Sequence, residues 1–506
     1  MKTLSSVRKN TYYDSVTLMG ISKKLNDLPD ILSVSVSMGT DMNKQILIDG
    51  GFDASSIGDA GPNDLMIACS FEDSVREEDV LADLEAALKK QVTQKDRDSE
   101  RPRTLTRAAE DIDANIAVIS VPGIYAAAEA RKALEKGLHV LMFSDNVSLD
   151  DEIALKDLAH SKGLLMMGSD CGTCAFQGVA FCFANAVQRG SIGIVSASGT
   201  GAQEAAVLLD SWGMGVSQII GTGGRDLSIE VGGRMFLDAF DALEADEGTS
   251  HILLISKPPH ETVARKVRDR AARSTKPVVA CFLGDVAEDL SETVLFKSDI
   301  VSAVDALALL VDSSFSAPEE SAIEVDCMPD GSYVRGLFCG GTLMEEAKMT
   351  FMSSLPDVDV YANSAKGGSI PLDDSSESRG HAFLDLGDDA FTQGKPHPMI
   401  DPQTRNARIA QEAADTETAI ILLDFVLGYG AHEDPVGAAL PAIHKANVSC
   451  LESGRTMVFI AYVLGTDADP QDKQHQEEML AQEGVLVCQT NVQAANLAAS
   501  IVKGLR

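Results

Sequence analysis

From about residue 113 onward, short apolar runs alternate strictly with helix-like stretches. The first of these elements are three apolar runs separated by two helical patterns, at 115–123, 124–136, 139–145, 149–162 and 164–170. Such alternation is typical of βαβ units, in which the parallel strands are buried beneath helices. The sequence therefore predicts an α/β protein with doubly wound parallel sheets.

The alternation continues in two further stretches, which are separated by an acidic, proline-bearing segment at 313–332. In the first stretch we expect strands at 191–199, 216–224, 251–259 and 277–284, and helices at 201–212, 233–245 and 260–273. In the second we expect strands at 333–341, 358–364, 419–430, 448–453 and 485–491, helices at 342–354, 435–445 and 456–464, and irregular structure from 365 to 405. Each stretch predicts a flavodoxin-like unit.

The first hundred residues form a separate small α/β unit in this interpretation. Strands are expected at 31–37 and 64–70 and helices at 14–27 and 77–92, followed by a charged linker from Gln94 to Arg107. The predicted domains are 1–95, 108–186 (Rossmann-like), 187–312 and 333–506.

Charge excludes several classes of partner. The formal net charge of −34 would repel nucleic acids and anionic membrane surfaces. Small anions remain possible ligands, because backbone N–H groups at helix ends bind them locally. No apolar run approaches the roughly 20 residues of a membrane span, and residues 1–16 lack the apolar core of a signal peptide. We expect a cytoplasmic protein.

The nine cysteines are scattered through apolar stretches, which indicates reduced core residues. Cys171 and Cys174 form a CxxC. No second CxxC or nearby histidine pair completes a zinc site, so a tight turn before a helix is the favoured interpretation and a metal or redox role the alternative.

The first candidate site is the turn at 195–204, where a buried strand runs into a helix. Ser198, Gly199 and Thr200 would present free N–H groups and small hydroxyls to a phosphate or carboxylate. The alternative is that Ser198 only caps the helix.

A second candidate is the turn at 423–435, again between a strand and a helix, with Pro435 suited to the first helical turn. Its Asp424 and Glu433 could bind a metal or accept a proton. His432 is a possible general acid or base, or else a solvent-facing polar residue beside a turn.

The third candidate is the proline-stiffened segment 394–408. It presents His397, Asp401 and Arg405 on a rigid loop, and Arg405 or Arg408 would suit capture of a carboxylate or phosphate. Weaker signals are the Gly-rich turns at 221–226, which contains Gly223 and Gly224, and at 340–342. Dinucleotide, P-loop, nucleophile-elbow and HExxH fingerprints are missing from the places where they would be required.

Taken in order, these motifs resemble the succinyl-CoA synthetase superfamily of NDP-forming acyl-CoA ligases, and most closely its FdrA-type branch. Residues 116–145 look like the latter half of a CoA-binding domain, and 168–174 stand where the family has a Gly-Pro-Asn-Cys turn. Residues 193–206 and 219–226 are similar to α-subunit motifs, and 383–391 and 422–435 to β-subunit motifs.

The resemblance implies that two helix N-termini face one phosphate site. Ser198, Gly199 and Thr200 would then oppose four residues of the second turn, Gly428, Tyr429, Gly430 and Ala431. The family's phosphorylated histidine follows the strand at 277–284, where this chain has none, and its orienting glutamate falls where this chain has Ser256-Lys257-Pro258-Pro259. An ATP-grasp domain is also missing.

FdrA-type proteins are associated with anaerobic allantoin and purine catabolism. The resemblance therefore implies a subunit of a carbamoyltransferase that converts oxalurate and phosphate into oxamate and carbamoyl phosphate. It implies small anionic substrates, partner subunits, and phosphate or CoA as a bound group, with no certain cofactor. An acyl-CoA ligase or CoA-binding subunit, and a non-catalytic scaffold or regulatory subunit, are the alternatives.

Overall fold

The structure is a computed structural model. It describes residues 2–9, 11, 18, 22, 31–49, 52–71, 102, 104–285, 287–325, 327–364, 366–392 and 395–505. The chain forms two compact units, one of residues 1–113 with 393–396 and one of residues 114–392 with 397–506.

The smaller unit contains a three-stranded antiparallel sheet in the order β1-β3-β2. Its elements are β1 (Lys2–Arg8), β2 (Ile31–Met38), α2 (Asp41–Asp49), α3 (Ala54–Ile57), β3 (Leu65–Phe71) and α5 (Leu105–Asp111). All seven residues of β3 are buried, because it is the central strand. The strands predicted at 31–37 and 64–70 are confirmed, β1 was not predicted, and the helices predicted at 14–27 and 77–92 lie largely outside the described residues.

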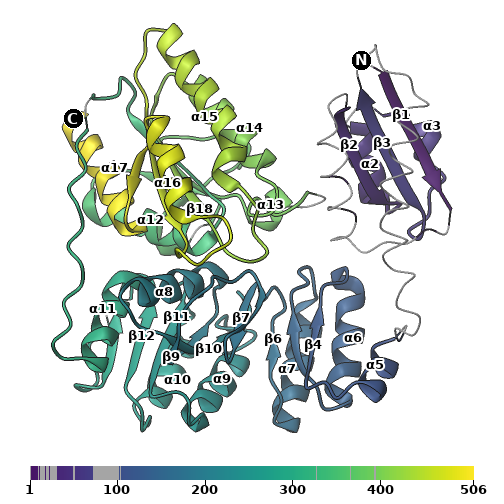
Figure 1. Cartoon of the computed structure of the whole chain (residues 1–506), viewed down its shortest axis with the longest axis vertical. Coiled ribbons are helices and arrows are strands. Elements are labelled where there is room, and N and C mark those ends of the chain that lie inside the picture. Colours follow the sequence, from purple (N-terminus) through teal and green to yellow (C-terminus); the bar gives the residue numbers. More distant parts are fainter. Residues whose placement is uncertain are drawn as a thin grey trace. The chain divides into compact units, whose positions relative to one another are not determined.

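The larger unit begins with a parallel sheet in the order β4-β5-β6, which with its helices we call the first lobe (Figure 1). Its elements are β4 (Ile116–Ile119), α6 (Gly123–Glu135), β5 (His139–Met142), α7 (Leu149–Lys162) and β6 (Met166–Met167). Helix α7 has the predicted bounds because the Ser148 hydroxyl accepts from Asp151 N at its start and Gly163, with φ 65°, ends it.

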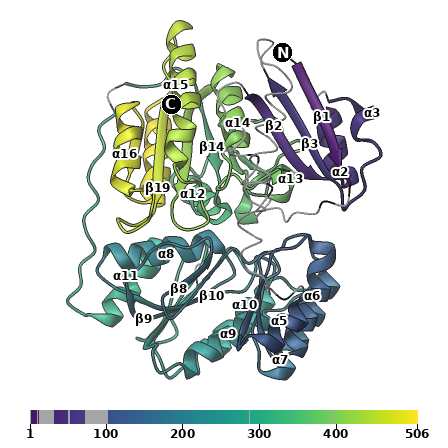
Figure 2. The same cartoon turned by 45° about the vertical axis from the view of Figure 1, so that its right-hand side comes forward.

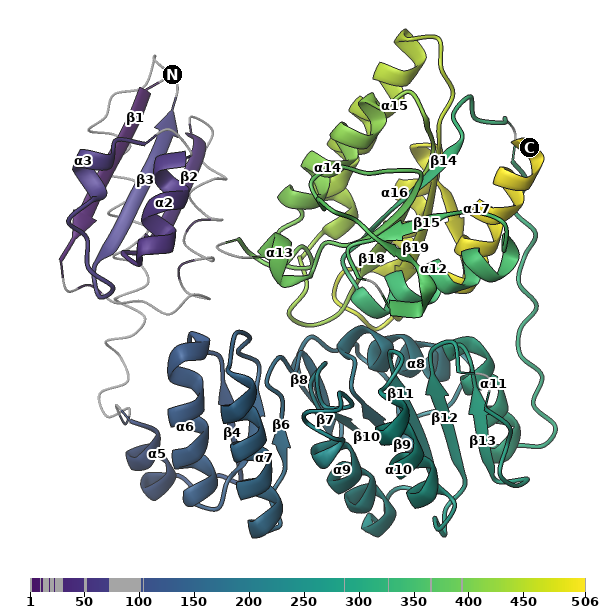
Figure 3. The ribbon, with the colours of Figure 1, turned by 180° about the vertical axis from the view of Figure 1, so that it is seen from behind.

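The second lobe is a seven-stranded sheet in the order β13-β12-β11-β9-β10-β7-β8. Its elements are β7 (Thr173–Phe176), β8 (Val179–Cys182), β9 (Arg189–Ser196), α8 (Gly199–Ser211), β10 (Val216–Gly221), α9 (Arg234–Ala245), β11 (His251–Ser256), α10 (Glu261–Ala271), β12 (Val278–Phe282), β13 (Val294–Lys297) and α11 (Ile300–Val311). Helices α8 and α11 cover one face and α9 and α10 the other (Figure 3). Strands β9 to β13 pair in parallel, whereas β7 is antiparallel to both β10 and β8.

The third lobe is a parallel sheet in the order β16-β15-β17-β14-β18-β19-β20. Its elements are β14 (Tyr333–Phe338), α12 (Gly341–Ser354), β15 (Val360–Ala362), the 3-10 helix η1 (Lys366–Gly368), β16 (Ile370–Pro371), β17 (His381–Asp385), α13 (Asp389–Thr392), α14 (Gln403–Ala414), β18 (Thr418–Val426), α15 (Pro435–Glu452), β19 (Val458–Leu464), α16 (Lys473–Gln482), β20 (Leu486–Cys488) and α17 (Asn491–Leu505). Helices α12 and α17 pack on one face, and α14, α15 and α16 on the other (Figure 2).

The predicted α/β fold with parallel sheets is confirmed, while several local expectations were wrong. Of the predicted strand at 448–453, residues 448–452 belong to helix α15, and 456–464, predicted as a helix, contain the strand β19. The stretch expected to be irregular contains β17 and α13. The CxxC leads into the strand β7 and not into a helix.

Candidate functional site

Helix α8 begins directly after β9, and Ser198 is its N-cap. The Ser198 hydroxyl accepts from Gly201 N at 3.0 Å, while its own N–H donates to Ser196 Oγ at 3.0 Å. This arrangement leaves Gly199 and Thr200 as the first-turn residues whose N–H groups have no acceptor within the helix. The predicted cap is thus confirmed, and the helix dipole favours negative charge at the same helix end. Anion binding by Ser198, Gly199 or Thr200 stays a prediction.

The helix whose N-terminus meets α8 is α12 of the third lobe. Ser198 Oγ is hydrogen-bonded to Thr342 Oγ1. A Cβ atom placed on Gly340 would lie 3.0 Å from Thr200 Cγ2, so the two helix starts are in van der Waals contact. The prediction that the start of α8 opposes the turn before α15 was therefore wrong: the start of α8 meets the turn at 340–342, where α12 begins.

The segment Gly428–Ala431, predicted to oppose Ser198, packs instead on residues 182–185. Tyr429 N donates to Ala184 O at 2.7 Å, and Gly428 N donates to Gln471 Oε1 at 3.0 Å. Positive φ angles at Gly428 (105°) and Gly430 (80°) permit this close approach. The prediction of a joint site with Ser198 was therefore wrong, because the loop at 428–431 lies against the residues that follow β8. Binding of a ligand by Gly428, Tyr429, Gly430 or Ala431 stays a prediction.

Two charged side chains lie over the N-terminus of α12. Lys257 follows β11 and Asp385 ends β17, and Lys257 Nζ lies 3.7 Å from Asp385 Oδ2. A Cβ atom on Gly341 would lie 2.5 Å from Lys257 Nζ and would collide with the Asp385 carboxylate, so only glycine leaves room there. Asp385 Oδ1 also accepts from Gly387 N at 3.0 Å. Burial raises the pKa of Asp385 despite the nearby ammonium of Lys257.

A helix N-terminus carries a partial positive charge, so it repels a nearby ammonium group unless an anion lies beside the two. Here Asp385 supplies one negative charge. A second anion at this place would be stabilised by the Lys257 ammonium, by the first amides of α8 and by the first amides of α12. The arrangement can therefore bind a doubly charged group such as phosphate.

His397 lies beside this helix end. Its Nδ1 accepts from Met399 N at 3.2 Å, so the neutral ring carries its proton on Nε2. A Cβ atom on Gly387 would lie 2.5 Å from His397 Nε2, so the ring is pressed against the turn that follows Asp385. Burial lowers the pKa of His397 to about 4, which keeps the ring neutral. The structure thus places the predicted His397 near Asp385, as a neutral hydrogen-bond donor.

Arg405 does not face a ligand. It is 1% exposed, its Nη1 donates to Asp424 O at 2.5 Å, and its guanidinium carbon lies 4.4 Å from the centre of the Phe425 ring. Asp424 is equally buried and accepts from Cys339 N and Gly340 N at 2.7 and 2.8 Å. Both residues therefore shape the turn before α12, which corrects the expectation that Arg405 captures a substrate from a surface loop.

The other two predicted catalytic residues serve local structure. Asp401 Oδ1 accepts from Gln403 N at 3.0 Å at the start of α14. His432 N donates to Met399 O at 2.8 Å, and its Nδ1 accepts from Asp434 N at 3.0 Å. A catalytic role for Asp401 or His432 stays a prediction.

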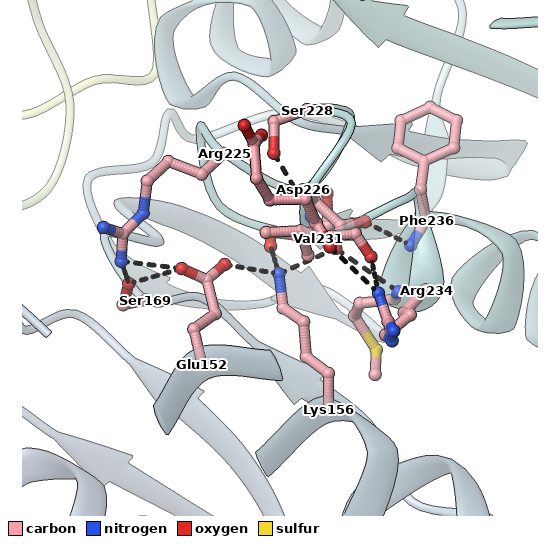
Figure 4. A network of polar contacts seen from close by, with 12 residues as sticks. Glu152, Lys156, Ser169, Arg225, Asp226, Ser228, Val231, Arg234 and Phe236 are labelled. Carbon is pink, nitrogen blue, oxygen red and sulfur yellow. Dashed lines mark hydrogen bonds and ion pairs between the residues drawn. The ribbon is translucent and has the colours of Figure 1, made fainter. Parts of the chain in front are cut away.

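A buried ion network fixes the Gly223–Gly224 turn against the first lobe (Figure 4). Lys156 of α7 is 0% exposed, and its Nζ lies 2.7 Å from both Glu152 Oε1 and Asp226 Oδ1. It also donates to Thr222 O at 3.0 Å. The Lys156 ammonium therefore anchors the turn to α7, and its charge is paired with the carboxylates of Glu152 and Asp226.

Arg225 extends this network toward solvent. Its Nη2 lies 2.7 Å from Glu152 Oε2 and donates to Ser169 Oγ at 2.7 Å (Figure 4). The same atom also donates to Val147 O at 2.8 Å. A Cβ atom on Gly223 would collide with Ser169 O. The turn at 223–224 thus packs directly against residues 168–170. Phosphate binding by Gly223 and Gly224 stays a prediction.

The two CxxC thiols are buried, with Cys171 Sγ 3.6 Å from Cys174 Sγ. The hydrogen bond with Cys174, and then burial, hold the pKa of Cys171 well above its ordinary value, so its thiolate is disfavoured. Within the described residues, no group of three or more His, Cys, Asp or Glu side chains is arranged to hold a metal.

Sequence reasoning missed Lys257 and Asp385 and ranked the turn at 340–342 low. The signal was present in the unusual Ser256-Lys257-Pro258-Pro259, which places a lysine where the resemblance implies a glutamate. The loop after β12, at 283–293, contains no histidine. In the described part of the chain, no helix is both long enough and apolar enough to cross a bilayer.

Two segments of the chain match known protein families. Residues 337–501 match the family described as CoA-ligase, and residues 1–104 match the family described as AllF, heavy metal-associated domain. The N-terminal residues do not fit a heavy metal, because positions 1–104 include no histidine and one cysteine. That residue, Cys69, is 0% exposed within β3, and burial raises its thiol pKa to about 11.

The chain is 44% identical over 506 residues to the uncharacterized protein YahF of Escherichia coli, covering 98% of each chain. It is 30% identical to the succinate–CoA ligase [ADP-forming] subunit alpha-2 of Trichomonas vaginalis over 37% of this chain and 61% of that relative. A solved structure of the dinucleotide-forming acetyl-coenzyme A synthetase 1 of Ca. Korarchaeum cryptofilum is 14% identical, with a TM-score of 0.33 over 80% of this chain and 87% of that one. The two family matches and the full-length relative show that the chain belongs to the FdrA-type branch of the succinyl-CoA synthetase and NDP-forming acyl-CoA synthetase superfamily.

Proposed function

We propose that the chain is a subunit of a carbamoyltransferase that converts oxalurate and phosphate into oxamate and carbamoyl phosphate, in anaerobic allantoin and purine catabolism. One observation carries the proposal. The starts of α8 and α12 meet beside Lys257, an arrangement that would stabilise a bound anion, while the loop after β12 has no histidine to accept a phosphoryl group. The phosphate at such a site is a substrate and not an enzyme-bound intermediate.

Phosphate would bind at the start of α8, on the N–H groups of Gly199 and Thr200, with Lys257 as its counterion. Donors that are already oriented stabilise charge without reorganisation during the reaction. In the direction of carbamoyl phosphate synthesis, a phosphate oxygen attacks the ureido carbonyl carbon of oxalurate. The neutral His397 would donate its Nε2 proton in a hydrogen bond to a substrate oxygen near Gly387.

Partner subunits are part of the proposal. Relatives of the chain include proteins named as subunits of succinate–CoA ligases. Residues 337–501, in the third lobe, match the CoA-ligase family. A hetero-oligomer is therefore proposed to supply the remaining binding surface for the acid substrate.

The test is phosphorolysis of oxalurate by the full chain combined with the products of neighbouring genes. Carbamoyl phosphate formation that depends on both phosphate and this chain supports the proposal. Omitting the chain is the first control. If the partner proteins make carbamoyl phosphate equally well without it, the proposed function is wrong.

A CoA-binding subunit of an acyl-CoA ligase is the second candidate, favoured by the match to the CoA-ligase family. Calorimetric titration of the full chain with CoA separates the two. Saturable CoA binding together with inactivity toward oxalurate would favour the ligase. A non-catalytic scaffold is the outcome if neither ligand binds and the chain is required only for complex assembly.

A further inference from the structure

A groove of about 670 Å³ lies where residues of the second and third lobes meet. We call it the arginine groove, and its walls include Pro258, Arg265, Arg268, Leu283, Gly284 and Met349. Pro258 belongs to the segment after β11 and Leu283 to the segment after β12, so the groove lies at the carboxyl ends of two neighbouring parallel strands. Ligands of open α/β sheets bind in crevices at this edge, in sites of roughly 300–1,000 Å³.

One face of α12 joins the arginine groove to the proposed phosphate site. Gly341, Glu345 and Met349 follow one another at four-residue spacing, so they lie on the same face of the helix. A Cβ atom on Gly341 would meet Lys257 Nζ, and one on Gly284 would collide with Met349 Cε. Glu345, between the two ends, pairs with a lysine of the same helix at 2.8 Å. The helical rise of about 1.5 Å per residue places Met349 about 12 Å from Gly341 along the helix axis.

Two arginines of α10 supply the positive charge of the arginine groove. Side chains of a helix lean toward its N-terminus, so these arginines extend toward the start of α10, which follows β11. Arg265 Nη2 donates to Glu261 Oε1, one turn earlier, at 2.8 Å. Arg268 pairs with Asp285, and its guanidinium carbon lies 5.2 Å from the centre of the Phe296 ring. Arg268 is therefore held in place, while Arg265, whose side chain is 68% exposed, can exchange its partner.

We propose that the arginine groove binds the acid substrate of the carbamoyl transfer, an inference that rests on the proposed function. The ligand class is a small carboxylate with an amide on the neighbouring carbon, as in oxamate and oxalurate. Its carboxylate binds the guanidinium groups of Arg265 and Arg268, and its nitrogen end points along α12 toward Lys257. A planar carboxylate matches the planar fork of a guanidinium group in bidentate geometry.

The length of the reacting pair fits the spacing between the two sites. When a phosphate oxygen meets the ureido carbon of extended oxalurate, about 6 Å separates the phosphorus from the carboxylate carbon, by ordinary bond lengths. A hydrogen bond places the arginine nitrogen about 4 Å beyond that carbon. Together these lengths are comparable with the distance of about 12 Å along α12. A carboxylate of an acid that reacts at the start of α12 therefore reaches the arginine groove.

The arginines beside other turns are less suited to this role. Arg405 and Arg408 are 1% and 5% exposed. Arg225 pairs with Glu152, which is 0% exposed, and breaking an ion pair with a buried carboxylate is unfavourable. The ion pair of Arg265 is exposed on both sides, so exchanging its partner for a substrate carboxylate costs little.

The test is calorimetric titration with oxamate, in the presence of phosphate, of the full chain alone and in complex with its partner subunits. Arg265→Gln, which removes the charge, and Arg268→Lys, which removes the planar fork, should each weaken oxamate binding by about 10-fold. Arg273→Gln, at an exposed position just beyond α10, is the matched control and should bind as the wild type does. In the active complex, the KM for oxalurate should rise by a similar factor in both variants, while the KM for phosphate stays unchanged.

The outcomes separate the two proposals. Oxamate binding that is equal in the wild type and all variants, or absent from both the wild-type chain and its complex, overturns the inference. If Arg268→Lys fails to fold, judged by its thermal unfolding, Arg265→Gln decides, because that side chain is exposed. A complex that makes no carbamoyl phosphate overturns the proposed function, whereas oxamate binding that depends on Arg265 would still support a carboxylate site in the arginine groove.

Discussion

At the scale of single residues, the proposed phosphate site depends most on the Lys257 ammonium. It lies 3.7 Å from Asp385 Oδ2 and next to Gly341 at the start of α12. The amides of a helix N-terminus are partial positive charges, so Lys257 and the amides repel one another until an anion lies between them. Phosphate affinity should therefore depend strongly on this one side chain.

Lys257→Met should weaken phosphate binding by about 10–100-fold, the value of one charge-assisted hydrogen bond of roughly 1.5–3 kcal/mol. Methionine keeps the length of the side chain and removes the charge. The measurement is calorimetric titration with inorganic phosphate at constant ionic strength. Lys266→Met, on the exposed face of α10, is the matched control. Equal phosphate affinity in the wild type and Lys257→Met would show that the anion binds elsewhere.

The residues of the site were only partly predictable. Ser198 was identified because capping and anion binding both follow from its position at the end of a buried strand. Arg405 was misjudged because its sequence neighbours are prolines, whereas its burial depends on Asp424, which is 19 residues away in the sequence. Lys257 and Asp385 come from different lobes, and only the folded chain brings them together.

At the scale of elements, α8 and α12 bury two carboxyl groups where they pack. Glu204 of α8 accepts from Tyr462 Oη at 2.7 Å. Glu346 of α12 accepts from Ile300 N at 2.9 Å and from Asn491 Nδ2 at 2.8 Å. Burial raises the pKa of Glu204 to about 8 and that of Glu346 to about 7. The contact between the second and third lobes therefore holds a proton on Glu204 at neutral pH.

This proton makes stability depend on pH. The folded-state pKa of Glu204 exceeds the ordinary value of 4.5, so folding takes up a proton between about pH 4.5 and 8. Stability should fall as pH rises through that window, by up to about 1.4 kcal/mol per pH unit for one proton. Glu204→Gln should flatten the dependence of Tm on pH. Glu261→Gln, which changes an exposed side chain on α10, should not. Parallel Tm profiles for wild type and Glu204→Gln would contradict the assignment.

The ion network under the Gly223–Gly224 turn is expected to be sensitive to the loss of its cation. Lys156→Met removes the cation that pairs with the buried Asp226 and leaves Arg225 to pair with Glu152, which should cost about 3–5 kcal/mol. Chemical denaturation of the full chain, followed by circular dichroism, gives the change in free energy of unfolding. Lys162→Met at the exposed end of α7 is the control. A loss for Lys156→Met no larger than that for the control would mean that the network is not stabilising.

Element boundaries were predictable where a local signal exists. Helix α7 has Ser148 at its start and Gly163 at its end, and its predicted bounds are correct. Strand β19 was mistaken for a helix because a fully apolar run of seven residues has no periodicity that separates a buried strand from a buried helix. Helix α15 was cut short for the related reason that its last turns, with Val448 and Leu451 exposed, lack a clear apolar face.

At the scale of the whole molecule, the alternation of strands and helices was sufficient to predict the parallel α/β architecture. It could not give the order of the strands, because pairing partners are chosen by long-range packing. The antiparallel hairpin β7–β8 at the edge of the second sheet is one example. The packing of α12 against the start of α8 is another example. It brings the turn at 340–342 next to Ser198, where the sequence had led us to expect the turn at 428–431.

The central claim is that phosphate acts as a substrate at the α8–α12 site and never becomes bonded to the protein. The most direct measurement incubates the full chain and its partner subunits with oxalurate and radiolabelled inorganic phosphate, without nucleotide. The account predicts labelled carbamoyl phosphate and a protein that carries no label after denaturation. Label retained on this chain as a phosphoryl group, or a reaction that requires a nucleotide, would contradict it.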